Sequence, residues 1–123
     1  MAMIPMELDM QGELINSTAQ HIYAPTGATT IINDLSLPGG HTYLIVGSYK
    51  FTNAIYTSSG ATVLSSLYDG SSNIETSYRY NNGDCLVAFY APSSTKTVSL
   101  RTFHSTGSQQ EIADVSLKAY RLD

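Results

Sequence analysis

Residues 41–51 have the sequence His41-Thr42-Tyr43-Leu44-Ile45-Val46-Gly47-Ser48-Tyr49-Lys50-Phe51. Every second position from Tyr43 onward carries an aromatic residue, an aliphatic residue or glycine, and this period of two is that of a β-strand. Leu44 and Val46 make the intervening positions apolar in the first half, which predicts a central strand covered on both faces there. The polar residues after Val46 return one face to water. The stretch therefore predicts a strand in the middle of a sheet.

The same alternation recurs along the chain, and no segment has the period of a helix. Turn signals separate the runs at Pro38-Gly39, Asp69-Gly70 and Asn82-Gly83. The further strands expected from this pattern are about 7–15, about 21–24, 29–37, 61–68, 74–80, 85–90, 95–104 and 111–122. Closely spaced strands without helices are typical of an antiparallel β-sandwich or barrel. The sequence predicts an all-β fold with eight to nine strands and no significant helix.

The composition indicates one domain whose surface is unusually poor in charge. The 123 residues suffice for a single core. Only 13% of them are charged, against a usual ~25%, whereas 29 are Ser or Thr and nine are Tyr. A weakly charged surface is often covered by partners. The net charge of −4, with the six Lys and Arg scattered singly, argues against nucleic-acid binding.

Two further features bear on the compartment and on membranes. Cys85 is the single cysteine, so no intrachain disulfide can form, which disfavours a secreted module and suits assembly inside a cell. No apolar run approaches the ~20 residues of a membrane span, and residues 1–7 lack the pattern of a signal peptide. We therefore expect no membrane partner.

The N-terminal residues differ in character from the rest of the chain. We divide the chain into an arm or attachment segment, residues 1–20, and a β-sandwich domain, residues 21–123. The segment carries Ile4, Met6 and Leu8 but is too short to build a core of its own. An apolar segment with no core to join typically binds a partner and orders as it docks. These three residues are candidates for that contact.

No arrangement of residues indicates catalysis. No Ser lies in a Gly-x-Ser-x-Gly turn, and no His and Asp are placed as its base and orienting group. The sequence predicts a protein that is not an enzyme and uses no cofactor.

Metal ligands are also too dispersed to indicate a site. His21, His41 and His104 lie far apart and are interpreted as loop-edge residues, although one His from each of three copies remains a way to bind a metal. Cys85 stands in an apolar strand and is interpreted as a buried thiol. The carboxylates weighed as calcium ligands are interpreted mainly as turn residues, and they are Asp9, Asp34, Asp69, Asp84 and Asp114. We expect no metal.

Tyrosines are the candidates for contacts outside the arm. An exposed Tyr offers a large rigid area and a hydroxyl, which suits a protein interface or a sugar-binding surface. Tyr78 and Tyr80 share one face of an expected strand, and Tyr56 lies in a polar loop. For these three, an interface and ordinary packing remain equally open. The tyrosines expected to pack at the core edge are Tyr43, Tyr49 and Tyr90.

Three stretches together resemble one family. Residues 35–48, Leu35-Ser36-Leu37-Pro38-Gly39-Gly40-His41-Thr42-Tyr43-Leu44-Ile45-Val46-Gly47-Ser48, look like the opening strand of the C1q/TNF-like jelly rolls. Asn82-Gly83-Asp84-Cys85-Leu86-Val87 is similar to that family's Gly-Asp before an apolar strand, and Ser116-Leu117-Lys118-Ala119-Tyr120-Arg121-Leu122 resembles its last strand. The short, Ser/Thr-rich version is most similar to bacteriophage virion proteins. This chain departs from the family in its compact middle and in having no collagen-like or coiled stalk.

The resemblance implies a fold and a role. The fold is a single antiparallel jelly roll that forms a homotrimer, with the C-terminal strand near the axis and Tyr90 and Tyr120 among the contact residues. The role is that of a non-enzymatic virion structural protein, assembled in the host cytoplasm, that decorates and stabilises the capsid. Its partners are then the major capsid protein or another virion protein.

Two other roles are alternatives. The chain could be the receptor-binding or glycan-binding head of a tail fibre or baseplate, with a host surface glycan as ligand. A cellular C1q/TNF-like ligand fits least, because a signal sequence and disulfides are both missing. The lack of a stalk favours the capsid role over the tail fibre.

Overall fold

The computed structural model describes residues 13–18, 22–52, 63–79 and 83–123, and these ranges contain nine strands and no helix. The strands are β1 (Glu13–Thr18), β2 (Ile22–Ala24), β3 (Thr30–Leu37), β4 (Tyr43–Phe51), β5 (Val63–Tyr68), β6 (Asn73–Arg79), β7 (Gly83–Tyr90), β8 (Lys96–His104) and β9 (Gln110–Arg121). The predicted all-β fold is confirmed. The described part of the chain has no helix long and apolar enough to cross a membrane.

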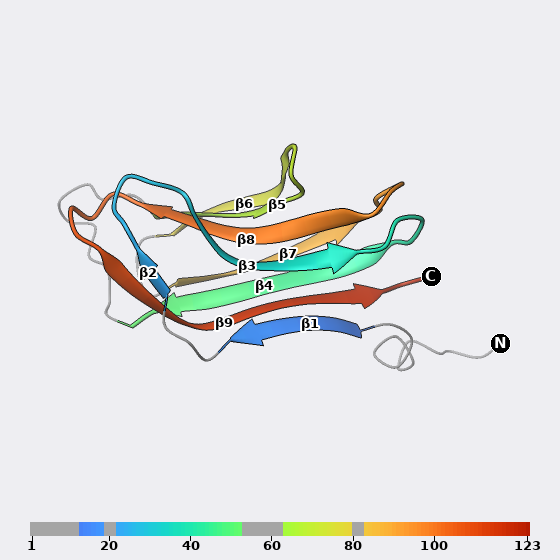
Figure 1. The fold of residues 1–123 in the computed structure, drawn as a ribbon, viewed down its shortest axis with the longest axis horizontal. Helices are drawn as coiled ribbons and strands as arrows, with labels where there is room; N and C mark the ends of the chain where they lie inside the picture. Colours follow the sequence, from blue (N-terminus) through green and yellow to red (C-terminus); the bar gives the residue numbers. More distant parts are fainter. Residues whose placement is uncertain (1–12, 19–21, 53–62, 80–82) are drawn as a thin grey trace.

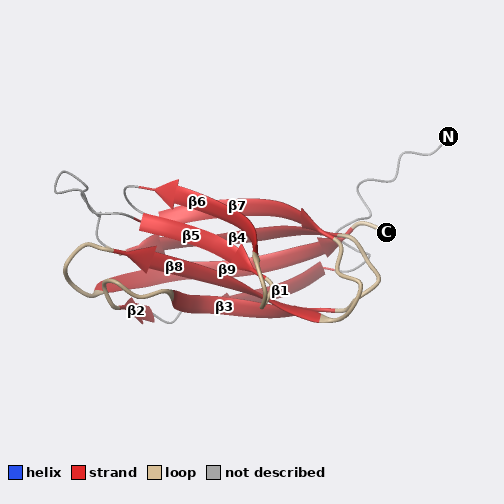
Figure 2. Cartoon of the chain, turned by 90° about the horizontal axis from the view of Figure 1, so that it is seen from above, coloured by secondary structure: helices blue, strands red, loops and turns tan. Residues whose placement is uncertain are grey.

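The strands form two antiparallel sheets packed face to face (Figures 1 and 2). The first sheet has the order β1-β9-β4-β7, with β2 also paired to β9, and the second has the order β3-β8-β5-β6. Most connections cross from one sheet to the other, so that β3 and β4 lie in opposite layers. This order is that of a jelly roll, which is built from Greek keys. The predicted jelly-roll sandwich is confirmed.

β1 and β2 lie end to end along β9. Glu13–Thr18 pair with the second half of β9, and Ile22–Ala24 pair with its beginning. The backbone of β1 therefore lies in the first sheet, although it belongs to the 1–20 segment for which the sequence suggested an arm. Ile4, Met6 and Leu8 lie outside the described residues.

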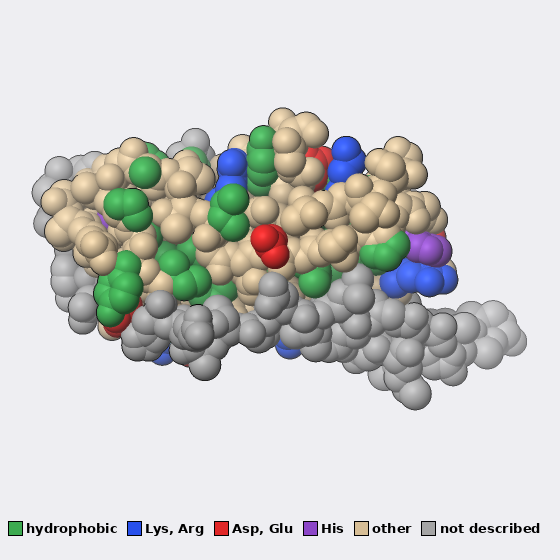
Figure 3. Space-filling view, in the orientation of Figure 1, with side chains coloured by type: hydrophobic (Ala, Val, Ile, Leu, Met, Phe, Trp, Pro, Cys, Tyr) green, Lys and Arg blue, Asp and Glu red, His purple; other side chains and the backbone are tan. Residues whose placement is uncertain are grey.

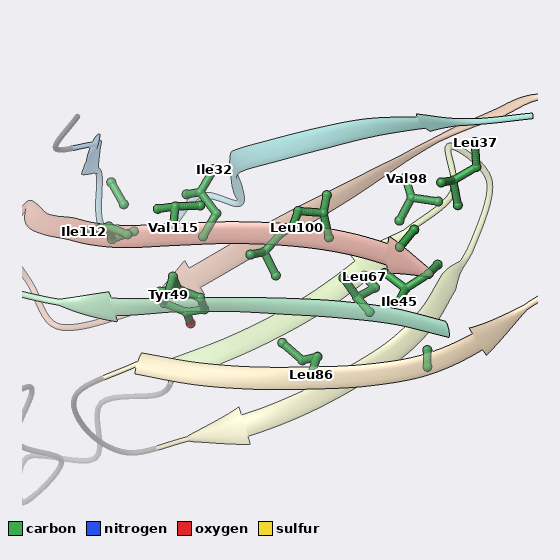
Figure 4. Packing of buried hydrophobic residues seen from close by; sticks show 14 of the residues in the cluster. Ile32, Leu37, Ile45, Tyr49, Leu67, Leu86, Val98, Leu100, Ile112 and Val115 are labelled. Atoms are coloured by element: carbon green, nitrogen blue, oxygen red, sulfur yellow. The ribbon is translucent and has the colours of Figure 1, made fainter. Parts of the chain in front are cut away.

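The core lies between the two sheets and is lined by alternate residues of the long strands (Figure 4). Ile45 and Leu117 from the first sheet face Leu67 and Leu100 from the second, and all four side chains are fully buried. Burying one such side chain contributes about 1.5–3 kcal/mol. The period-two pattern of the sequence thus becomes one closely packed apolar layer.

Hydroxyl groups are also buried between the sheets. The Tyr49 hydroxyl lies 3.0 Å from Thr102 Oγ1 and makes a short hydrogen bond with Ser65 Oγ. Burial raises the pKa of Tyr49, so the phenol stays neutral over a wide range of pH. These hydrogen bonds connect β4 to β5 and β8 and leave the hydroxyls satisfied inside the core.

His104 is fully buried, which corrects its interpretation as a loop-edge residue. It occupies an inward-facing position of β8, on the same side of the strand as Leu100 and Thr102. Its Nε2 lies 2.7 Å from the Ala24 carbonyl oxygen, and its Nδ1 lies 3.1 Å from Thr106 Oγ1. Both ring nitrogens thus have partners, which offsets the loss of water on burial.

The turn between β3 and β4 packs against the loop between β7 and β8. The Gly40 N–H donates to the Pro92 carbonyl oxygen over 2.8 Å, and Gly40 has a φ of +85°, which glycine adopts without steric cost. A Cβ on Gly39 would lie 2.5 Å from the backbone of Ser94. The Pro-Gly-Gly signal therefore marks a turn where two loops approach closely.

Candidate interaction surfaces

β7 presents apolar side chains outward. Within it, Leu86 and Ala88 are buried, while Val87 is 50% exposed and Phe89 is 71% exposed. Cys85 is exposed as well, so its interpretation as a buried thiol is wrong. Both sets of alternate positions are apolar, and the pattern alone gave no way to tell which set points inward.

β4 continues this outward surface. In the antiparallel pairing of β4 with β7, Leu44 stands opposite Phe89 and Val46 stands opposite Val87. Leu44 and Val46 are only partly buried, although the sequence predicted cover on both faces at these positions. We define the β4–β7 face as the five outward residues Leu44, Val46, Cys85, Val87 and Phe89.

β9 borders the β4–β7 face with more polar residues. Tyr120 stands opposite Leu44, and Lys118 stands opposite Val46. Farther along, Lys50 Nζ lies 2.9 Å from Asp114 Oδ2. The pairing of β4 with β9 is irregular here, and Asp114 has a φ of 54°, which non-glycine residues seldom adopt. The first sheet thus changes from apolar at β7 to polar at β9.

On the outer face of the second sheet, one side chain of β8 covers residues of β5 and β6. The Arg101 guanidinium lies 3.8 Å from the centroid of the Tyr68 ring. Its Nη2 donates to Asn73 Oδ1 over 2.9 Å and its Nε to Ser66 Oγ over 3.4 Å. Ser66 points outward but is only 5% exposed. We call Arg101, Tyr68, Asn73 and Ser66 the Arg101 cluster.

Tyr90 and Asp69 join β7 to the turn between β5 and β6. The Tyr90 hydroxyl donates to Asp69 Oδ2 over 3.0 Å. Burial, followed by the contact with Asp69, raises the pKa of Tyr90 to about 12. Asp69 Oδ1 accepts the N–H groups of Ser72 and Ser71, which lower the pKa of this carboxyl group. The interpretation of Asp69 as a turn residue is confirmed.

The other predicted contact residues are only partly placed. Tyr120 is partly buried and lies beside the β4–β7 face, whereas Tyr90 is partly buried and packs against the core. Tyr78 belongs to β6, but its side chain is outside the description. The remaining candidates lie outside the described residues, and they are Ile4, Met6, Leu8, Tyr56 and Tyr80.

Sequence reasoning missed Val87 and Phe89 as candidate contact residues. The signal available was the run Cys85-Leu86-Val87-Ala88-Phe89-Tyr90, which is apolar at both sets of alternate positions. In a sandwich of two layers, such a run leaves one apolar side of the strand without cover. The sequence does not reveal which of the two apolar sides of β7 faces the core, because that depends on its pairing with β4.

A separate exposed aromatic side chain lies on β2. Tyr23 is 57% exposed, and a hydrogen bond with the Glu111 carboxylate raises its pKa. Ile31 on β3 is 59% exposed. Figure 3 shows that charged side chains are few and scattered on the side of the molecule it presents. Tyr23 and Ile31 are thus two further large exposed side chains, on β2 and β3.

Among the described residues, no group of three or more His, Cys, Asp or Glu side chains is arranged to hold a metal ion. His41 Nδ1 lies 3.3 Å from Asp123 Oδ1, and the Thr42 N–H donates to Asp123 Oδ2 over 3.3 Å. These contacts fasten the end of β9 to the start of β4. The absence of a metal requirement stays a prediction.

Several solved structures match this chain in fold. No protein-family model matches the sequence, and no curated protein sequence matches it. The VP2 subviral particle of infectious bursal disease virus matches with a TM-score of 0.60 and 10% identity, over 90% of this chain and 32% of that chain. T=1 particles derived from the same virus match with a TM-score of 0.57 and 11% identity, over 89% and 31% of the two chains.

A structure of the Gt strain of that virus also matches, with a TM-score of 0.55 and 11% identity, over 89% of this chain and 32% of that chain. This chain spans about a third of the length of the chains it matches. At such low identity the likeness establishes a shared β-sandwich fold of the kind found in a viral capsid protein.

Proposed function

We propose that this chain is a non-enzymatic structural protein of a bacteriophage virion, a homotrimeric C1q/TNF-like jelly roll that decorates and stabilises the capsid. The observation that carries the proposal is the β4–β7 face on a jelly roll whose fold is shared with VP2. The sequence resemblance to phage virion proteins supplies the bacteriophage and trimer parts of it.

The surface chemistry supports an assembled protein over a free monomer. A side chain such as Phe89, 71% exposed next to three other apolar residues, is stabilised when a partner removes it from water. Only 13% of the residues are charged, so few repulsive charges oppose association. Closed rings of identical subunits are the usual form of such assemblies.

The trimer part is tested by measuring the mass of the purified full chain by light scattering at micromolar concentration. We expect three times the chain mass of 13.3 kDa. A monomer mass under these conditions refutes the trimer.

In this proposal the N-terminal segment binds the capsid, and Ile4, Met6 and Leu8 make the contact. Deleting residues 1–8 should leave the jelly roll folded, because β1 begins at Glu13. The truncated trimer should no longer sediment with capsid particles, while the full chain does. Normal decoration by the truncated chain would move the attachment surface to the sandwich.

A receptor-binding head of a tail fibre or baseplate is the second candidate, and Tyr23 is the observation that favours it. An exposed ring held by the carboxylate of Glu111 is the kind of group that stacks on a sugar. Binding of the full chain to a panel of host surface glycans, abolished by Tyr23→Ala, would support this role. Capsid binding without glycan binding supports the first.

A further inference from the structure

We propose that the buried His104 ring and the Thr106 hydroxyl form a proton-sensitive latch at the end of the sandwich where β2, β8 and β9 meet. When the ring takes up a second proton, the latch holds the loop between β8 and β9 more tightly. The inference concerns hydrogen bonds inside one chain, so it depends neither on the proposed virion role nor on the trimer.

The Thr106 hydroxyl has three hydrogen-bond partners and only one proton to donate. Its Oγ1 lies 3.1 Å from His104 Nδ1 and 3.0 Å from the Ser108 carbonyl oxygen, and it accepts from Gln110 Nε2 over 3.0 Å. A carbonyl oxygen only accepts, so the bond to Ser108 requires the hydroxyl proton. In that arrangement the hydroxyl accepts from the ring, and Nδ1 must carry a proton of its own.

The other ring nitrogen must carry a proton as well. His104 Nε2 lies 2.7 Å from the Ala24 carbonyl oxygen, which again only accepts. The ring and the hydroxyl therefore satisfy all of these contacts at once only when both nitrogens are protonated and the ring is a cation.

A neutral ring leaves one of the contacts unmet. With its proton on Nε2, the single Thr106 hydroxyl proton serves either His104 Nδ1 or the Ser108 carbonyl. The bond to Nδ1 is favoured, because the ring is fully buried, whereas Ser108 is exposed and its carbonyl can bind water. The neutral chain thus loses the hydrogen bond that closes the loop between β8 and β9.

That loop is fastened to the loop between β2 and β3 at the same place. The Gly27 N–H donates to the His104 carbonyl oxygen over 2.7 Å, and the Gly107 N–H donates to Thr26 Oγ1 over 3.1 Å. Gly107 directly follows Thr106, so a bond lost at the Thr106 hydroxyl weakens the hold on Gly107. The amides of the two glycines therefore report on the state of the latch.

The ring itself contacts uncharged groups of the neighbouring strands. The Phe51 ring of β4 lies edge-on to it, with the ring centroids 6.1 Å apart, and Val63 of β5 stands opposite it in the sheet. On β2 and β9, the titratable side chains Tyr23 and Glu111 bond each other, and Tyr23 is 57% exposed. Neither of these two groups competes for the ring nitrogens.

Two titratable groups point into the same core. Tyr49 on β4 stands opposite Asp84 on β7, and the Tyr49 hydroxyl is bonded to Thr102, two residues before His104. Asp84 is the one acid among the buried residues that the structure describes. Its carboxylate attracts a positive charge in the core, and this offsets part of the cost of burying the imidazolium ring.

Nitrogen-15 NMR of the ring in the purified full chain tests the protonation states between pH 8 and pH 5. At pH 8 we expect a proton on Nε2 of His104 alone, and at pH 5 we expect protons on both nitrogens. A ring that stays neutral throughout this range overturns the inference, as does a ring that carries its proton on Nδ1 at pH 8.

Amide hydrogen exchange measures the latch. After correction for the pH dependence of exchange in an unfolded chain, the protection of the Gly107 and Gly27 amides should increase about fivefold as the ring is protonated, which is the effect of one added hydrogen bond. The Asp69 amide donates to the Ser72 carbonyl in the turn between β5 and β6, and it is the internal control that should not change.

Two variants of Thr106 isolate the hydroxyl. Thr106→Val keeps the branched shape without the hydroxyl, and its Gly107 protection should not respond to protonation of the ring. Thr106→Ser keeps the hydroxyl and should respond as the wild-type chain does. A fivefold response in Thr106→Val overturns the latch.

His104→Gln isolates the ring, because Gln retains an N–H group for the Ala24 carbonyl but does not titrate. This variant should lose the response, and a response that persists would assign it to another titrating group. Far-UV circular dichroism checks that each variant is folded. If His104→Gln does not fold, the comparison of Thr106→Val with Thr106→Ser decides the same question.

Discussion

The outer faces of the two sheets differ in how their side chains are satisfied. On the second sheet, Arg101 lies over Tyr68 and covers Ser66, so the polar groups find partners within the same chain. On the first sheet, Phe89 and Val87 have no comparable cover among the described residues. The first arrangement contributes to the stability of one chain. The second leaves apolar surface whose burial contributes free energy only when a partner arrives.

The largest loss of stability is expected for a buried apolar residue, Leu100, and it contrasts with the loss expected for the outward residue Phe89. This fully buried side chain lies in the core, and Leu100→Ala should lower the free energy of unfolding by about 2–5 kcal/mol. Phe89→Ala should change the stability of a single chain by no more than about 0.5 kcal/mol. In urea unfolding at several protein concentrations, the loss for Leu100→Ala should stay constant and that for Phe89→Ala should grow with concentration. Equal losses at every concentration would show that Phe89 acts within one chain.

Next in size is the contribution of the Arg101 cluster. Arg101→Ala removes the contact with the Tyr68 ring and the hydrogen bonds to Asn73 and Ser66, and should lower the free energy of unfolding by about 1–2 kcal/mol. Lys50→Ala is the control on the first sheet, because its ion pair with Asp114 is mostly exposed and should contribute less than about 0.5 kcal/mol. Similar losses for both variants in urea unfolding would mean that the second sheet does not depend on its own polar cover.

The strands could be predicted from the sequence, but the two outer faces could not. In β4 the alternation from Tyr43 to Phe51 contains enough polar residues to show which side faces the core. In β7 both alternating sets are apolar, so the outward direction of Phe89 follows only from its pairing with β4. Arg101 and Tyr68 come together because β8 and β5 are neighbours in the sheet. The local sequence does not indicate that these two strands pair.

In the core, the burial of His104 could not be predicted from the sequence either. By composition a histidine near a Gly-containing loop is expected at the surface. Its position in β8 points the side chain inward. The Ala24 carbonyl and the Thr106 hydroxyl replace the hydrogen bonds that the ring nitrogens would make with water, and this offsets the cost of burial. Ala24 ends β2 and Thr106 lies in the loop between β8 and β9, and the sequence pattern does not place either of them beside His104.

A smaller loss of stability is expected at Asp114, on the polar side of the first sheet. Two variants of this residue distinguish the contribution of its backbone conformation from that of its charge. Asp114 has a φ of 54°, a conformation that Asp and Asn adopt more readily than Ala. Asp114→Ala should lower the free energy of unfolding by about 0.5–1 kcal/mol, and Asp114→Asn should leave it nearly unchanged. Thermal or urea unfolding of the two variants at one concentration measures this difference. A loss for Asp114→Asn as large as that for Asp114→Ala would assign the effect to the ion pair with Lys50.

The smallest effect concerns Tyr90, whose side chain points to the opposite side of β7 from its neighbour Phe89. Its hydroxyl donates to Asp69, and Tyr90→Phe should lower the free energy of unfolding by about 0.5 kcal/mol at pH 7, because the contact is only partly buried. The pKa of Tyr90 is raised from 10.0 to about 12 in the folded chain. Its contribution is therefore fully present below pH 10 and is lost as the pH rises toward 12.

The difference in unfolding midpoint between the wild-type chain and Tyr90→Phe should accordingly be larger at pH 8 than at pH 11. The lowered pKa of Asp69 gives the opposite dependence in acid, since its contribution is present above the ordinary value of 3.8 and is lost as the pH falls below it. Phe89→Ala carries no titrating group, so its effect on association should not change between pH 8 and pH 11. Parallel pH profiles for Tyr90→Phe and the wild-type chain would show that the hydroxyl contributes nothing through Asp69, and that both sides of β7 act by apolar contact alone.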